Sequence, residues 1–271
     1  EGSNSHTFEP APRIAKALAQ ADVIFVNGLH LEDPTLALAR KNKKRSARIV
    51  EIGTAVLPPT GYLYDFSFPR SEGKPNPHLW TDPLLVRSYA RVIADTMDAV
   101  DPAHAAGYDA GYEAFSARVD QLDAAMRASF GSIPAERRKL LTYHDAYAYF
   151  GRDYGWKVIG AIQVESFKDP SPKEVAALIQ QVEREKVPAI FGSEVFPSPV
   201  LAQIGRETGV AYVDTLRDDD LPGRPGDADH SWFGLMRADF VTMTRAMGGD
   251  TGPLERLDVT DAAGDHARYP Q

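Results

Sequence analysis

One amphipathic stretch constrains the fold more than any other part of the chain. Between residues 103 and 130, apolar residues recur at spacings of three or four: Tyr108, Tyr112, Phe115, Val119, Leu122, Met126 and Phe130. This is the period of one face of an α-helix. A helix over 103–130 is roughly 40 Å long at 1.5 Å per residue. It is long enough to run along two lobes, so it predicts two halves joined by one rigid helix.

Strand and helix patterns alternate on both sides of this helix. Strands are predicted at 22–26, 47–52, 139–143, 156–162, 188–192 and 210–216. Helical patterns separate them, which is typical of βα units and parallel sheets. The predicted fold class is therefore α/β, with two α/β lobes joined by one long linking helix.

The predicted division of the chain follows from these patterns. It comprises an N-terminal lobe at 1–102, the linking helix at 103–130, a C-terminal lobe at 131–247 and a tail at 248–271. The tail has weak periodicity and is expected to be loop. Residues 57–77, rich in Pro, Gly and Tyr, predict a long irregular loop.

Composition excludes several classes of function. The 271 residues carry a net charge of −8, which argues against a nucleic-acid partner. The absence of cysteine excludes disulfides, thiolate metal sites and cysteine nucleophiles. No apolar run approaches the roughly 18 residues of a membrane-spanning helix.

Three of the seven histidines stand on connections between predicted elements. His6 and His78 lie in loops before helices, and His144 lies at a strand-to-helix junction. Such connections meet at one edge of α/β sheets, where ligands bind. Each histidine alone is equally well explained as a hydrogen-bonded structural residue. His104 is expected to face solvent, and the contexts of the other three histidines show no repeated pattern.

A run of three acids, Asp218 to Asp220, follows the last predicted strand. From composition alone, such a run is more often a solvated turn. Beside three histidines, however, one of these acids becomes a candidate metal ligand. Three imidazoles and one carboxylate form a closed tetrahedral set of nitrogen and oxygen ligands, which suits Zn²⁺.

Several motifs occur in the order seen in a known family. They are Ser5-His6-Thr7-Phe8-Glu9-Pro10, Ala21-Asp22-Val23 with Asn27-Gly28, Asn76-Pro77-His78-Leu79-Trp80, Tyr143-His144-Asp145-Ala146-Tyr147, and the acids before Ser231-Trp232-Phe233-Gly234. With these motifs the chain resembles the metal-binding solute-binding proteins of ABC importers, cluster A-I, typified by ZnuA and TroA. The resemblance covers roughly residues 5 to 247.

The resemblance implies that His6, His78, His144 and one acid bind the metal. Asp219 matches the aspartate of the family best, and Asp218 and Asp220 stay open as alternatives. The spacings of 66 residues from 78 to 144 and 75 from 144 to 219 are most similar to the zinc protein AztC. Manganese members of the family carry glutamate where His144 stands, so the resemblance implies zinc; a manganese or iron carrier is the alternative.

The resemblance also implies a function. It implies a periplasmic, monomeric protein that captures Zn²⁺ between its lobes and delivers it to an ABC-type permease in the inner membrane. A periplasmic zinc metallochaperone is a further candidate partner. The long helix predicts local ordering of the ligand loops instead of a large closure. An enzyme is not expected: a catalytic zinc site keeps an open position, and the chain has no His-Glu-x-x-His pattern.

Two departures and one ambiguous residue accompany the resemblance. Family members have a β-α-β stretch before the first ligand, whereas this chain begins almost at His6. Zinc members often carry a histidine-rich loop, but residues 57–77 contain no histidine. Asp145 is expected either to orient an imidazole or to cap the following helix.

Overall fold

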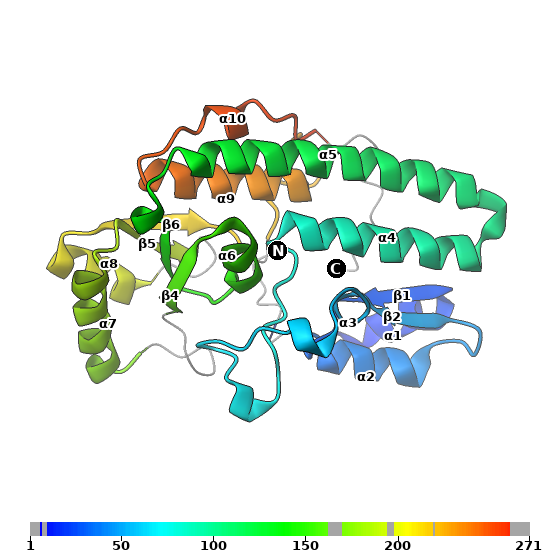
Figure 1. The fold of residues 1–271 in the computed structure, drawn as a ribbon. Helices are drawn as coiled ribbons and strands as arrows, with labels where there is room; N and C mark the ends of the chain where they lie inside the picture. Colours follow the sequence, from blue (N-terminus) through cyan, green and yellow to red (C-terminus); the bar gives the residue numbers. More distant parts are fainter. Residues whose placement is uncertain (1–5, 7–9, 162–169, 194–197, 219, 261–271) are drawn as a thin grey trace.

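One long helix, α5 (Ala105–Gly131), runs along both halves of the molecule (Figure 1). This computed structural model describes residues 6, 10–161, 170–193, 198–218 and 220–260. The helix predicted over 103–130 is confirmed, except that Pro102–His104 form a separate 3₁₀ turn before it. The short turn folds α5 back along α4 (Pro83–Val100), which begins with the side chain of Asp82 accepting a hydrogen bond from Leu84 N.

The apolar stripe of α5 has two environments. Val119, Leu122, Met126 and Phe130 are buried in the core of the C-terminal half. Tyr108, Tyr112 and Phe115, at the other end of the stripe, are only partly buried. The C-terminal part of the helix is therefore built into a core, whereas its N-terminal part lies along α4.

The N-terminal half contains a two-stranded parallel sheet. Val23 pairs with Arg48 and Val26 pairs with Glu51. Its elements are α1 (Pro12–Gln20), β1 (Val23–Val26), α2 (Asp33–Asn42), β2 (Arg48–Glu51) and α3 (Ile52–Val56). The sequence analysis did not predict α3, because five residues are too few to show a helical period.

The C-terminal half contains a four-stranded parallel sheet of order β4-β3-β5-β6. Its elements are β3 (Lys139–Thr142), α6 (Ala148–Tyr154), β4 (Lys157–Ala161), α7 (Pro172–Glu185), β5 (Ala189–Ser193), α8 (Pro199–Thr208), β6 (Ala211–Leu216) and α9 (Trp232–Ala246). From β3 the chain adds β4 on one side of the sheet and then β5 and β6 on the other, so the order of the strands reverses between β3 and β5. Ligands bind at such a switch point. His144 follows β3 and Asp218 follows β6 at this carboxyl edge.

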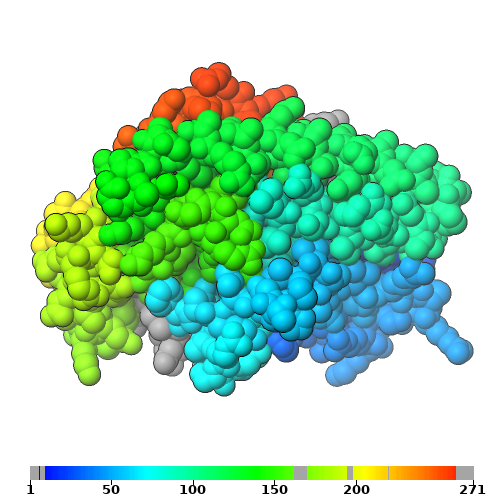
Figure 2. Space-filling model, viewed as in Figure 1, coloured from blue at the N-terminus to red at the C-terminus, as the bar shows by residue number. Residues whose placement is uncertain are grey.

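The irregular segment predicted at 57–77 is confirmed, with only two 3₁₀ turns in it. It connects the halves: Leu63 N donates to the Tyr149 hydroxyl at 3.2 Å, and Ser67 N donates to Asp145 Oδ2 at 3.1 Å. In the space-filling view this cyan segment lies between the blue N-terminal elements and the green C-terminal ones (Figure 2). The two halves are therefore joined by more than the long helix.

The tail was expected to be loop, and that prediction is wrong for its first part. Residues Gly252–Glu255 form the short helix α10, in which Leu254 is fully buried. Arg118 on α5 donates to the carbonyls of Asp258 and Thr260. A single turn of helix gives no readable period, so sequence pattern did not show it. Residues 261–271 lie outside the described part of the chain.

The two-lobe α/β architecture on one long helix is thus confirmed, while the exact residue boundaries of the lobes stay a prediction. Among the residues that the structure describes, no helix combines the length and the apolar character needed to cross a membrane.

Candidate metal centre

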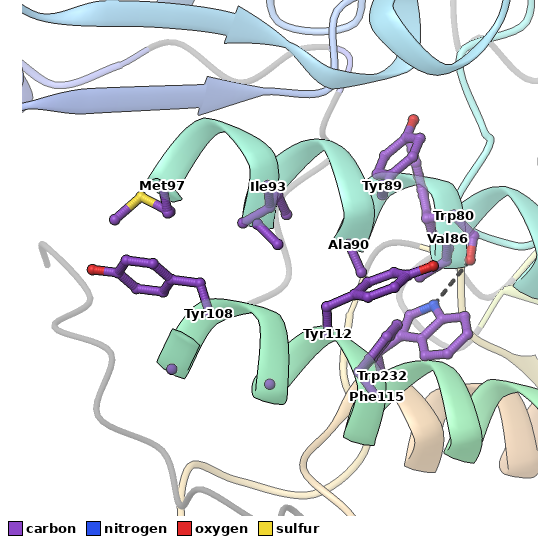
Figure 3. Close-up of a pocket in the computed structure, with 13 residues that line it drawn as sticks. Trp80, Val86, Tyr89, Ala90, Ile93, Met97, Tyr108, Tyr112, Phe115 and Trp232 are labelled. Carbon is purple, nitrogen blue, oxygen red and sulfur yellow. Dashed lines mark hydrogen bonds between the residues drawn. The ribbon is translucent and has the colours of Figure 1, made fainter. Parts of the chain in front are cut away.

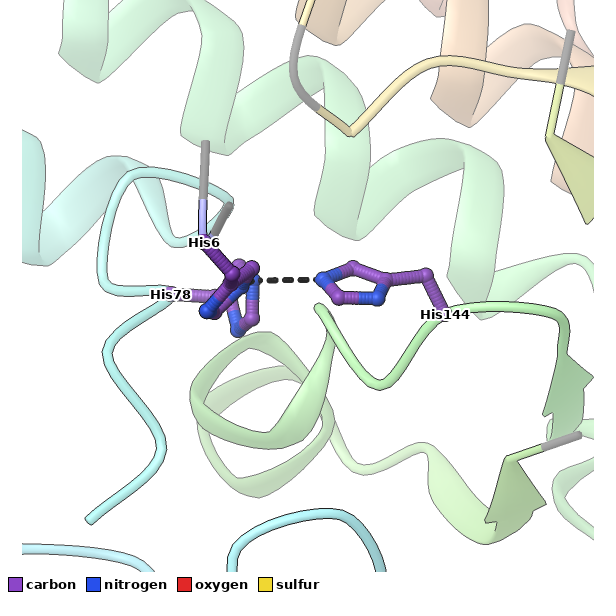
Figure 4. A group of neighbouring side chains, drawn as sticks. All are labelled: His6, His78 and His144. Atoms are coloured by element: carbon purple, nitrogen blue, oxygen red, sulfur yellow. Dashed lines mark hydrogen bonds between the residues drawn. The ribbon is translucent and has the colours of Figure 1, made fainter. Parts of the chain in front are cut away.

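Three histidines from three distant segments meet at one point (Figure 4). His78 Nε2 lies 2.9 Å from His6 Nε2 and 2.8 Å from His144 Nε2. The ligand atoms of the three side chains all lie within 4.8 Å of one another. The structure therefore brings together all three histidines that the sequence analysis selected.

The surroundings of His78 and His6 favour their uncharged forms. Burial lowers the pKa of His78 well below its usual value, and the nearby His144 and His6 rings lower it further. Burial, with a contribution from His144, lowers the pKa of His6 to about 3. Both imidazoles are therefore neutral near pH 7. Since neutral imidazoles offer nitrogen lone pairs, the cluster is suited to a cation.

A carboxylate lies beside the imidazoles. Asp218 Oδ2 is 3.7 Å from His144 Nε2, and the Asp218 side chain is buried. Asp219, the acid that matched the family best, lies outside the described residues. Asp218 therefore lies against one of the three histidines, His144.

Two side chains, the partly buried Trp80 and the buried Asp239, fix the backbone where the acidic run begins. Trp80 Nε1 donates to the Asp218 carbonyl at 2.8 Å, and Arg217 N donates to Asp239 Oδ1 at 2.9 Å. The other carboxylate oxygen of Asp239 accepts from the Tyr147 hydroxyl. Burial raises the pKa of Asp239 well above its usual value, although its two hydrogen bonds oppose the shift. Asp239 therefore connects α9 to the segment that carries the acids.

Asp145 does something other than predicted. Helix α6 has no side-chain cap, and the carboxylate of Asp145 instead accepts a hydrogen bond from Ser67 N in the irregular segment. Burial, together with the facing Asp65, raises the pKa of Asp145 well above its usual value. The prediction that Asp145 caps the helix is wrong: this carboxyl group holds the 57–77 segment against the C-terminal half.

The remaining described histidines lie elsewhere. His104 is exposed and pairs with Asp101 at 2.8 Å, so its predicted position in solvent is confirmed. His30 pairs with Asp33 on the surface, and His230 Nδ1 contacts the Pro222 carbonyl. His266 lies outside the described residues.

Sequence reasoning did not assign a role to several residues around the cluster. Asn76 and Trp80 were noted only as parts of a motif, although each contacts a ligand or its backbone. The role of Asp239 could have been predicted from the sequence, although it was not. It interrupts an otherwise apolar buried face of α9 formed by Phe233, Met236, Phe240 and Met243, and a buried carboxylate is retained only where it is hydrogen-bonded.

A separate, apolar cavity lies between α4 and α5 (Figure 3). Its volume is about 540 Å³, and aliphatic and aromatic side chains such as Ile93, Met97 and Phe115 line it. Trp80 forms part of its wall and also packs against the His78 ring at 4.9 Å. The cavity contains no group of metal ligands, so the histidine cluster is the candidate site.

Comparisons with known proteins find metal-binding relatives. Residues 1–246 match the family model of ZnuA, the periplasmic zinc-uptake complex component A. The chain is 28% identical to the iron-binding protein YfeA of Yersinia pestis, over 91% of this chain and 77% of that protein. It is 26% identical to the manganese-binding lipoprotein MntA of Halalkalibacterium halodurans, over 91% of this chain and 78% of MntA.

Solved structures show the same architecture. The periplasmic zinc-binding protein TroA of Treponema pallidum superposes with a TM-score of 0.79 at 26% identity, covering 91% of this chain and 88% of TroA. A crystal structure of ZnuA superposes with a TM-score of 0.74 at 24% identity, covering 92% and 88%. The names of these similar proteins agree on a metal ion but differ on which one.

Proposed function

Since the chain belongs to the ZnuA family of periplasmic zinc-uptake components, we propose that it binds Zn²⁺ as the cargo of an ABC importer. In this proposal His6, His78, His144 and one acid of the run 218–220 hold the ion between the two halves. The protein then delivers it to the cognate membrane permease.

The observation that carries the proposal is the meeting of three imidazoles at one point. All three Nε2 atoms face the same space, and they come from both halves of the chain. Three nitrogen ligands with one carboxylate favour Zn²⁺ over Mn²⁺, which prefers oxygen ligands. The metals named for YfeA and MntA keep an iron or manganese carrier as the alternative.

The fourth ligand in this proposal is one of three neighbouring acids, Asp218, Asp219 or Asp220. Sequence spacing favours Asp219, whereas the position of Asp218 beside His144 makes Asp218 its competitor. Three single substitutions, Asp218→Asn, Asp219→Asn and Asp220→Asn, separate them. The variant that lowers zinc affinity most identifies the ligand; equal small effects in all three would remove the carboxylate from the proposal.

A zinc hydrolase is the alternative from another class. Catalytic zinc keeps one position for water, usually with three protein ligands. The buried Asp218 carboxylate next to the cluster supports a closed set of four ligands instead. A carrier is therefore proposed, with no enzymatic activity.

Several finer features belong to the same proposal. We place the protein in the periplasm, as a monomer, with an inner-membrane permease as partner and a zinc metallochaperone as a further candidate donor. The spacing of the ligands supports an AztC-like zinc branch within cluster A-I. The contacts of the 57–77 segment with Tyr149 and Asp145 support local ordering around a rigid frame.

Competition titration tests the choice of metal. Apoprotein is titrated with Zn²⁺ and with Mn²⁺ in the presence of a chromophoric chelator, and the two dissociation constants are compared. Zinc is expected to bind more tightly. Tighter binding of Mn²⁺ would contradict the zinc assignment, and the absence of binding by either ion would contradict the site.

A further inference from the structure

We propose that Asn76 is the positioning residue of the metal site. Its side chain sets which nitrogen of His78 carries the proton, and it also joins the His78 loop to the segment that carries His144. This inference rests on the proposed function, because it concerns the same three histidines.

The orientation of the Asn76 amide is fixed by three hydrogen bonds. Its Nδ2 lies 2.9 Å from Asp65 Oδ2 and 2.8 Å from the Asp145 carbonyl, a group that can only accept. Its Oδ1 accepts from the backbone N–H of His78 at 3.0 Å, a group that can only donate. Exchanging the amide oxygen and nitrogen would break these bonds, so Oδ1 must face His78.

The fixed amide in turn fixes the tautomer of His78. Asn76 Oδ1 lies 2.7 Å from His78 Nδ1, and an amide oxygen can only accept. His78 Nδ1 therefore carries the proton. In the neutral form of this tautomer the lone pair is on Nε2. That lone pair points to the space shared with His6 and His144 (Figure 4).

The same residue also connects the two halves of the site. Besides the bond from Nδ2 to the Asp145 carbonyl, the Asn76 carbonyl accepts from the Tyr149 hydroxyl at 3.0 Å. A third bond runs from Thr81 Oγ1 to the Ala146 carbonyl at 2.7 Å. Asn76 and Thr81 are fully buried. These bonds lie on both sides of His78 and follow His144 directly, so they hold the two rings as one unit before metal arrives.

Buried hydrogen bonds of this kind are effective because their loss leaves polar groups without partners. In metal sites, removing the group that orients a ligating histidine weakens metal binding by roughly 10–100-fold. Asn76 has two such roles, so its substitution is expected to change both the tautomer of His78 and the affinity for zinc.

The test combines nuclear magnetic resonance with zinc titration. In ¹⁵N-histidine-labelled apoprotein, the ring nitrogens of His78 are expected to show the Nδ1–H tautomer. Asn76→Ala is expected to remove this preference and to raise the zinc Kd by about 10–100-fold. Asn76→Asp keeps an acceptor oxygen beside His78 Nδ1 but loses the Nδ2 donor, so it is expected to keep the Nδ1–H signature while zinc binding is still weakened. Asn42→Ala, which removes a side-chain bond to the Leu38 carbonyl on α2, is the matched control and should change neither quantity.

The possible results separate the inference from the proposed function. An Nε2–H tautomer of His78 in the wild-type apoprotein would overturn the inference without any variant. A zinc Kd for Asn76→Ala within twofold of wild type would also overturn it, provided that His78→Ala still abolishes tight binding. If His78→Ala itself binds zinc normally, the proposed metal site fails.

Discussion

Two parts of the candidate site are built differently. His78 and His144 are buried, and hydrogen bonds between their own loops hold them together through Asn76, Thr81 and Tyr149. His6 is partly exposed, and its ring contacts the other two histidines and Phe68. The backbone of Arg217 and Asp218 is held by hydrogen bonds to Asp239 and Trp80.

This difference indicates a division of labour. We expect the His78–His144 pair to form a prearranged half-site, because its geometry is set by the protein before binding. His6 and the acid then complete the coordination. Preorganised ligands need little ordering on binding, so their loss should cost the most affinity.

The largest effect is expected from His78→Ala and His144→Ala. Four-ligand structural zinc sites provide about 10–16 kcal/mol, or roughly 3 kcal/mol per ligand, so each variant should weaken zinc binding on the order of 100-fold or more. Chelator competition measures this. If His78→Ala or His144→Ala weakened zinc binding less than His6→Ala does, the His78–His144 pair would not be the prearranged half-site.

His6→Ala should have a smaller effect, about 10-fold to 100-fold on the zinc Kd, because the half-site of His78 and His144 remains. The loss should appear mainly as faster dissociation, which stopped-flow transfer of zinc to a chelator measures. His104→Ala, which changes an exposed histidine paired with Asp101, is the control and should match wild type. An unchanged dissociation rate in His6→Ala would exclude this histidine as a ligand.

Thr81→Val removes one bond of the prearranged pair at nearly constant volume. Since the Ala146 carbonyl then loses its buried donor, unfolding of the apoprotein should become easier by about 1–2 kcal/mol. Zinc affinity should fall less than 10-fold, because the Asn76 bonds remain. Thr96→Val, at a partly buried hydroxyl that bonds the Val92 carbonyl within α4, is the matched control for chemical denaturation. Equal destabilisation by both variants would mean that the bond from Thr81 to the Ala146 carbonyl contributes no more stability than a side-chain bond within a helix.

The last expected effect concerns the stability of the apoprotein as a function of pH. The pKa of His6 is about 3 in the folded chain and that of His78 is also lowered, whereas the ordinary value is 6.5. Between these values the unfolded chain binds more protons, so stability is complete above about pH 6.5 and is lost as the pH falls toward 3. Thermal unfolding of apoprotein at several pH values measures this. His6→Ala should flatten the dependence; an unchanged slope would mean that other groups cause it.

Much of this organisation was readable from the sequence. The 3.6-residue period over 103–130 and the alternating strands and helices predicted the two-lobe fold, because burial imposes those periods. The ordered motifs selected His6, His78 and His144, which the structure brings together. Periodicity could not reveal α3 or α10, since both are too short.

The supporting residues were harder to predict. The role of Asn76 depends on bonds to residues 65 and 145, which are distant in sequence and meet only in the folded chain. The carboxylate of Asp145 was expected either to orient an imidazole or to cap its own helix, whereas it accepts a hydrogen bond from the distant Ser67 N. Local patterns therefore predicted the ligands, but long-range hydrogen bonds decide how the ligands are held.

X-ray absorption at the zinc edge of the zinc-loaded protein tests the central claim most directly. The account predicts a four-coordinate ion with three imidazole nitrogens at about 2.0–2.1 Å and one carboxylate oxygen at about 2.0–2.2 Å. His144→Ala should remove one imidazole from this spectrum. A six-coordinate shell of oxygen, or a wild-type spectrum without imidazole scattering, would contradict it.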